Sequence, residues 1–113
     1  MSVSQRDAAA MTGLSSKNID NLVQFGYVKP RLVSRRRTFD QLALAQIKAV
    51  ATMKGVIPPL VSTAIGKAVY KAGLASKEGV QVWDDAGSWK VGMEAPHDVI
   101  ALRIREPLLR LHG

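Results

Sequence analysis

The sequence predicts an α+β fold, with a mainly helical first part and a small antiparallel β element at its C-terminal end. Apolar residues recur at helical spacing in four segments before residue 73, and glycine or proline separates these segments. After residue 73 the spacing changes to the period-2 alternation that is typical of strands. We therefore divide the chain into a helical domain over residues 1–73 and a β-rich tail over residues 74–113.

The composition is that of a globular protein without thiol chemistry. Hydrophobic residues make up 47% of the 113 residues and charged residues 22%, which excludes a disordered chain. Cysteine is absent, so disulfides and thiolate metal sites are excluded and a cytoplasmic location is expected. No apolar run has the length that spans a bilayer, and the polar N-terminus is not expected to be a secretory signal.

Positive charge is concentrated in the first half of the chain. Residues 1–60 hold nine basic and three acidic side chains, a net charge of +6, within a total of +7. Residues 61–113 hold seven basic and six acidic side chains, a net charge of +1. Such an excess favours a polyanionic partner for the first half.

Local signals predict the first two helices. Ser4 can accept a hydrogen bond from the backbone N–H three residues on, and Gly13 can take the positive φ that ends a helix. Ser15 or Ser16 is expected to cap a second helix over residues 16–25. Two short helices joined by a tight glycine-containing turn form a helix-turn-helix.

The second helix has one apolar face and one polar face. Its apolar residues Ile19, Leu22 and Val23 follow the spacing i, i+3, i+4. Amides and a lysine, which can reach the edges of DNA bases, lie opposite them. This polar face carries Lys17, Asn21 and Gln24.

An arginine-rich hairpin, or wing, is expected after this helix. Residues 27–30 are expected to be extended because Lys29 precedes a proline, residues 31–34 to turn, and residues 35–39 to return as a strand. The four arginines of the hairpin repel one another, which costs stability unless a negative partner meets them. These arginines are Arg31, Arg35, Arg36 and Arg37.

Two further helices and the tail complete the prediction. Asp40 is expected to cap a third helix over residues 41–53, and Pro58 and Pro59 to start a fourth helix that ends at Gly73. The tail is expected to form a hairpin from residues 80–83 and 89–93 around a turn at 84–87, followed by an unpaired strand over residues 99–104.

The order of these pieces resembles the MerR-type winged helix-turn-helix DNA-binding family, including its excisionase-like members. The resemblance rests on residues 8–15, 25–30 and 37–42 and covers about residues 3–57. It implies that helix 16–25 enters the major groove and that the wing over residues 31–37 lies along the phosphates or in the minor groove. The chain departs from the family's effector-sensing regulators, because the helix after Pro59 is expected to hold only about four turns before Gly73 and the residues after it read as β instead of continuing into a long dimerisation helix and a ligand or metal domain.

We therefore expect a sequence-specific, double-stranded DNA-binding protein of bacterial or phage origin, a nucleoid-associated transcriptional regulator. An excisionase-like architectural recombination factor, and an antitoxin or adapter whose tail binds another protein, stay open as alternatives. DNA contacts are expected from Ser15, Ser16, Lys17, Asn18, Asn21, Gln24, Lys29, Arg31, Arg35, Arg36 and Arg37. A homodimer or partner contact through the tail is expected from Trp83, Trp89, Ile100, Leu102 and Ile104.

Catalysis, metal binding and a cofactor are not expected. The two histidines, His97 and His112, lie in the tail, and Asp84 and Asp85 lie in a predicted turn, where aspartate is favoured for backbone reasons. No phosphate-binding glycine loop or metal-ligand spacing occurs. Arg37 has the alternative of pairing with an acidic side chain instead of DNA. Tyr27 and Phe39 are expected to be core residues.

Overall fold

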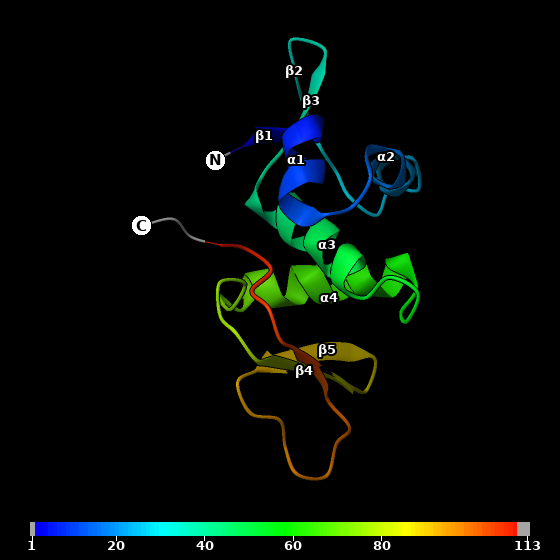
Figure 1. Cartoon of the computed structure of the whole chain (residues 1–113). Helices are drawn as coiled ribbons and strands as arrows, with labels where there is room; N and C mark the ends of the chain where they lie inside the picture. The colour runs from blue at the N-terminus through cyan, green and yellow to red at the C-terminus, as the bar shows by residue number, and fades with distance from the viewer. Residues whose placement is uncertain (1, 111–113) are drawn as a thin grey trace.

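The computed structural model describes residues 2–110 and confirms the α+β class, with four helices and two small antiparallel sheets within these residues (Figure 1). The helices α3 (Gln41–Thr52) and α4 (Pro59–Lys71) lie between a hairpin of residues 31–39 at one end and a sheet of residues 80–104 at the other (Figure 1). The elements in chain order are β1 (Val3–Ser4), α1 (Gln5–Thr12), α2 (Ser16–Gln24), β2 (Arg31–Val33), β3 (Arg36–Phe39), α3 (Gln41–Thr52), α4 (Pro59–Lys71), β4 (Val80–Asp85), β5 (Ser88–Gly92) and β6 (Leu102–Ile104).

The predicted helix caps are confirmed for α1, α2 and α3. The hydroxyl of Ser4 accepts from the backbone N–H of Asp7 at 3.2 Å, and Ser15, rather than Ser16, caps α2. The carboxylate of Asp40 accepts from the N–H of Ala43 at 2.9 Å. These bonds satisfy N–H groups that have no partner inside the helix, so the start of each helix is fixed locally.

The β2–β3 hairpin turns later and more tightly than the sequence suggested. The predicted turn over residues 31–34 was wrong, because Arg31–Val33 is a strand and the turn consists of Ser34 and Arg35 alone. These two residues have φ values of 50° and 66°. Positive φ at both central residues is the geometry that matches the twist of two-residue hairpins. The first sheet has the order β1-β3-β2, and β1 was not predicted.

Two hydrophobic clusters share α3 between them. Ile19 of α2 and Phe39 of β3 pack with Leu44 in the first cluster, and all three are at most 1% exposed. Ala45 and Ala49 of α3 belong to the second cluster. The core position predicted for Phe39 is confirmed, whereas Tyr27 is only half-buried.

The second cluster joins α3 and α4 to the second sheet. Ile65 of α4 and Val80 of β4 are each at most 1% exposed there. The two helices cross closely at Gly66, where a Cβ atom would lie 2.8 Å from Gln46 Cα and 2.9 Å from the Ala45 carbonyl oxygen. Only glycine fits this crossing without moving backbone. The predicted domain boundary after residue 73 stays a prediction.

The second sheet has the order β5-β4-β6, which corrects the prediction for the third tail strand. The strand is shorter than residues 99–104, and it is not unpaired, because β6 pairs with β4 and places Ile104 opposite Val80. Pairing buries Ile104 in the second cluster. His112 lies outside the described residues. No helix within residues 2–110 is long and apolar enough to cross a membrane.

Candidate nucleic-acid interface

The polar face of α2 is solvent-exposed, as the helical periodicity predicted. Ile19 and Leu22 anchor the opposite face, being 0% and 3% exposed in the first cluster. Asn18 lies at the side and is half-buried, whereas Ser15 and Ser16 at the start of α2 are exposed. The exposed face carries Lys17, Asn21 and Gln24.

The β2–β3 hairpin presents its arginines on two faces and a tip. Side chains opposite one another in an antiparallel pair lie on one face, and successive residues alternate between faces. Arg35 lies at the tip, in the turn. Lys29 is exposed just before the hairpin. The register pairs Arg31 with Thr38, Leu32 with Arg37 and Val33 with Arg36.

Arg37 identifies the hairpin face that is turned toward α2. Its Nη1 lies 2.6 Å from Asp20 Oδ1 of α2 in a salt bridge. Because Arg31 and Arg36 lie on the other face, their exposed side chains point away from α2. The hairpin therefore presents exposed cations on its outer face and at its tip, and none of them forms a salt bridge with another of residues 2–110.

A hydrogen-bonded cluster of Gln5, Asp20 and Arg37 holds α1, α2 and β3 together. Gln5 Nε2 donates to Asp20 Oδ1 at 2.7 Å and to the Ser16 hydroxyl at 3.0 Å. Arg37 Nη1 donates to Gln5 Oε1 at 3.2 Å as well as to Asp20. The alternative that Arg37 pairs with an acidic side chain is confirmed. Gln5 had no sequence signal beyond its place in the first turn of α1.

The charge of Asp20 is stabilised by this cluster. The hydrogen bond from the Gln5 amide is the main cause that lowers the pKa of Asp20 below its ordinary value of 3.8. The hydrogen bond and the positive charge of Arg37 lower the pKa further. The carboxylate is therefore ionised at neutral pH and binds the guanidinium that fixes the hairpin against α2.

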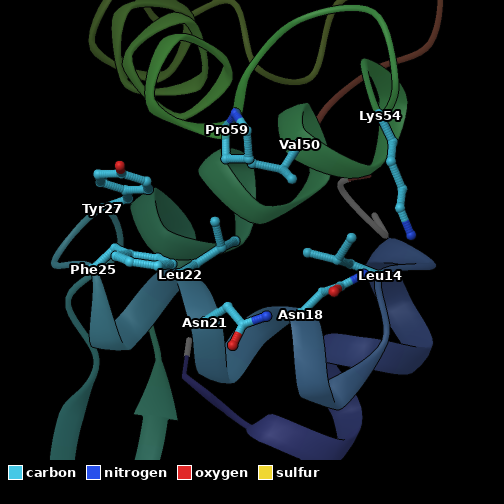
Figure 2. A pocket seen from close by; sticks show the side chains of 9 residues that line it. All are labelled: Leu14, Asn18, Asn21, Leu22, Phe25, Tyr27, Val50, Lys54 and Pro59. Atoms are coloured by element: carbon cyan, nitrogen blue, oxygen red, sulfur yellow. The ribbon is translucent and has the colours of Figure 1, made fainter.

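A pocket of about 320 Å³ lies along α2 (Figure 2). It brings two predicted DNA-contact residues, Asn18 and Asn21, next to Phe25 and Lys54. The pocket could not be predicted, because α2 meets the end of α3 and the start of α4 only in the folded chain. Phe25, which lines the pocket, is an apolar residue that stays 68% exposed.

The predicted partner-binding residues do not form one exposed surface. Ile104 is 3% exposed in the core, and Trp89 and Leu102 pack partly buried against the second cluster. Trp83 is half-buried. Ile100 lies in the loop before β6 and is 98% exposed.

The tail turn, the possible metal ligands and the comparison with known proteins complete the description of the site. The predicted turn over residues 84–87 was too long, because Asp84 and Asp85 belong to β4 and the turn consists of Ala86 and Gly87 alone. Asp84 Oδ1 still accepts from the N–H of Gly87 at 3.1 Å. Within residues 2–110, no group of three or more histidine, cysteine or acidic side chains is placed to hold a metal ion. Comparisons with protein-family models, with curated proteins and with solved structures found no match to this chain.

Proposed function

We propose that this protein is a sequence-specific, double-stranded DNA-binding protein that regulates transcription. In this proposal α2 lies in the major groove, and the β2–β3 hairpin acts as a wing on the neighbouring backbone or minor groove. The observation that carries the proposal is the salt bridge of 2.6 Å between Arg37 and Asp20. It links an exposed, amide-bearing helix to an exposed, cationic hairpin at one end of the molecule (Figure 1).

The polar face of α2 has the groups that read base edges. The major groove is about 12 Å wide and admits a helix, and asparagine or glutamine pairs with adenine through two hydrogen bonds. Asn21 and Gln24 are exposed on α2, one turn apart, and Lys17 is exposed two turns before Gln24. Because the opposite face of α2 is held by the core, these side chains would enter the groove on a rigid support.

The hairpin supplies contacts to phosphates. Lys29, Arg31, Arg35 and Arg36 are all exposed, and none of these four belongs to the hydrogen-bonded cluster of Gln5, Asp20 and Arg37. Each phosphate neutralised by such a cation changes the slope of log affinity against log salt by about −0.9. Arg37, being bound to Asp20, positions the hairpin instead of neutralising a phosphate.

The test is binding of the purified protein to fragments from its own upstream region, measured by fluorescence anisotropy across a salt series. We expect tight binding to one fragment and a steep salt dependence. The variant Arg35→Ala with Arg36→Ala should bind more weakly, and its salt slope should be shallower by about 1.8, the loss of two phosphate contacts.

The matched control replaces two exposed tail cations, Lys77→Ala with Lys90→Ala, which removes the same net charge outside α2 and the hairpin. Its salt slope should stay close to that of the wild-type protein. Failure of the wild-type protein to bind any of these fragments at low salt would contradict the proposal. Equal losses in the two double variants would instead reduce it to general attraction between opposite charges.

A further inference from the structure

The pocket beside α2 has the form of a small-molecule site. Ligand sites are concave, about 300–1,000 Å³ in volume, mostly apolar, and hold a few polar groups that orient the ligand. This pocket has a volume of about 320 Å³ and lies between α2, the end of α3 and the start of α4 (Figure 2). Leu14, Leu22 and Val50 give it apolar walls.

One end of the pocket is aromatic. The rings of Phe25 and Tyr27 are stacked, with centroids 5.6 Å apart and planes 25° from parallel. Phe25 is 68% exposed, so much of the apolar surface of its side chain is in contact with water. A flat apolar molecule that covered this ring would remove that surface from water, which favours binding.

The polar groups of the pocket favour an anion. Among the side chains of residues 2–110, Lys54 is the charged one that lines the pocket, and no salt bridge joins it to an acidic side chain of these residues. The amides of Asn18 and Asn21 line the pocket on the α2 side (Figure 2). The ammonium group of a lysine and the N–H groups of an amide donate hydrogen bonds, and a carboxylate accepts them.

We propose that this pocket binds a small organic anion with an aromatic body and a carboxylate, and that the bound molecule weakens the binding of DNA. The ring lies against Phe25 and Tyr27, and the carboxylate lies toward Lys54 and the two amides. Weakening follows because Asn18 and Asn21 belong both to the pocket and to the predicted DNA-contact set. This second half of the proposal rests on the proposed function, whereas the first half does not.

The first experiment uses the full chain without DNA. The probes are 2-naphthoate and its uncharged analogue 2-naphthylmethanol, titrated into ¹⁵N-labelled protein and followed by amide chemical shifts. We expect shifts at residues 14–27 and 50–60 and a higher affinity for the carboxylate. Lys54→Met should weaken 2-naphthoate about five-fold and leave 2-naphthylmethanol unchanged, because an exposed charge pair contributes modestly.

Lys77→Met is the matched control, since it removes an exposed lysine from the tail and should change neither affinity. Shifts scattered over the whole chain, no shifts at the pocket residues, or an unchanged affinity of Lys54→Met for 2-naphthoate would each overturn the pocket site. Lys54 is exposed, so the variant is expected to fold.

The second experiment adds 2-naphthoate to the DNA titration. We expect a lower DNA affinity of the wild-type protein, a smaller loss for Lys54→Met, and no loss with 2-naphthylmethanol at the same concentration. An unchanged DNA affinity at a saturating probe concentration would overturn the coupling. If the protein binds no DNA at all, the proposed function and the coupling both fall, whereas the shifts measured without DNA still decide the pocket.

Discussion

The α2–hairpin end and the second-sheet end of the molecule are attached to the same helix pair but expose different chemistry. At the first end the strand side chains Arg31, Leu32 and Val33 are all exposed, and polar contacts with α2 fix the position of the hairpin. At the second end the strand side chains Val80 and Val82 are buried against α4. A strand that lies against the core stabilises the fold, whereas a strand that projects from it is free to contact another molecule.

The largest expected effect is on the helix crossing that supports both ends. Gly66→Ala would place a methyl group against backbone atoms of α3, so the helices must separate. Overpacking of this kind costs about 1–3 kcal/mol, and we expect about 2 kcal/mol even after the better helix propensity of alanine. Urea denaturation measures the loss. Lys67→Ala, its exposed neighbour on α4, is the control and should change stability by less than about 0.5 kcal/mol.

A second prediction concerns only the α2 end. Gln24→Ala removes an exposed amide, so the variant should leave the core intact. Gln24 does not line the pocket beside α2, so the variant leaves the proposed ligand site unchanged as well. We expect a loss of about 1–3 kcal/mol in the affinity for the preferred fragment and little loss for unrelated DNA. Anisotropy with both DNAs measures the difference. An equal loss on both DNAs would show that Gln24 contacts no base.

The third prediction separates positioning by Arg37 from phosphate contact. Asp20→Asn removes a negative charge near the DNA, so it should raise affinity if only charge mattered. If Asp20 instead holds the hairpin through Arg37, the variant should bind DNA more weakly than the wild-type protein, with the salt slope unchanged. Arg37→Met should then lose a similar amount and also keep its slope. A shallower slope for Arg37→Met alone would identify a phosphate contact.

Acid should weaken the same cluster. The pKa of Asp20 is lower in the folded protein than its ordinary value of 3.8, because of Gln5 and Arg37. A carboxylate with a lowered folded pKa contributes stability that is present above the unfolded value and is lost as the pH falls through the folded value. The difference in unfolding free energy between the wild-type protein and Asp20→Asn should therefore shrink below about pH 3.8. A constant difference down to the acid unfolding region would contradict this role.

Local signals in the sequence predicted most of the elements, whereas contacts between distant residues were missed. Ser4, Asp40 and Gly13 act within one turn of their own helix, so sequence spacing alone predicts the helix ends they form. The pairing of β6 with β4 depends on segments about twenty residues apart, and no local pattern determines it. The pocket has the same origin, because it exists only where α2 meets α3 and α4.

The turn of the hairpin was missed for a different reason, and it gives the smallest predicted effect. Ser34 and Arg35 adopt positive φ, although asparagine and glycine are the usual residues of such turns. A side chain in this conformation is strained by about 1 kcal/mol. Arg35→Gly should therefore stabilise the protein by a fraction of that amount, since the strain is relieved while the unfolded chain gains freedom.

The same substitution should also weaken DNA binding, because it removes the cation at the hairpin tip. Arg35→Ala is the matched variant, since it removes the charge and keeps a side chain at positive φ. The two variants should show the same salt slope, shallower than that of the wild-type protein by about 0.9, but only Arg35→Gly should be the more stable in urea. Tighter DNA binding by Arg35→Gly would mean that the order of the turn, and not the charge of Arg35, limits the contact. Equal slopes with unequal stabilities would instead show that the chain keeps an arginine in a strained position for the sake of its charge.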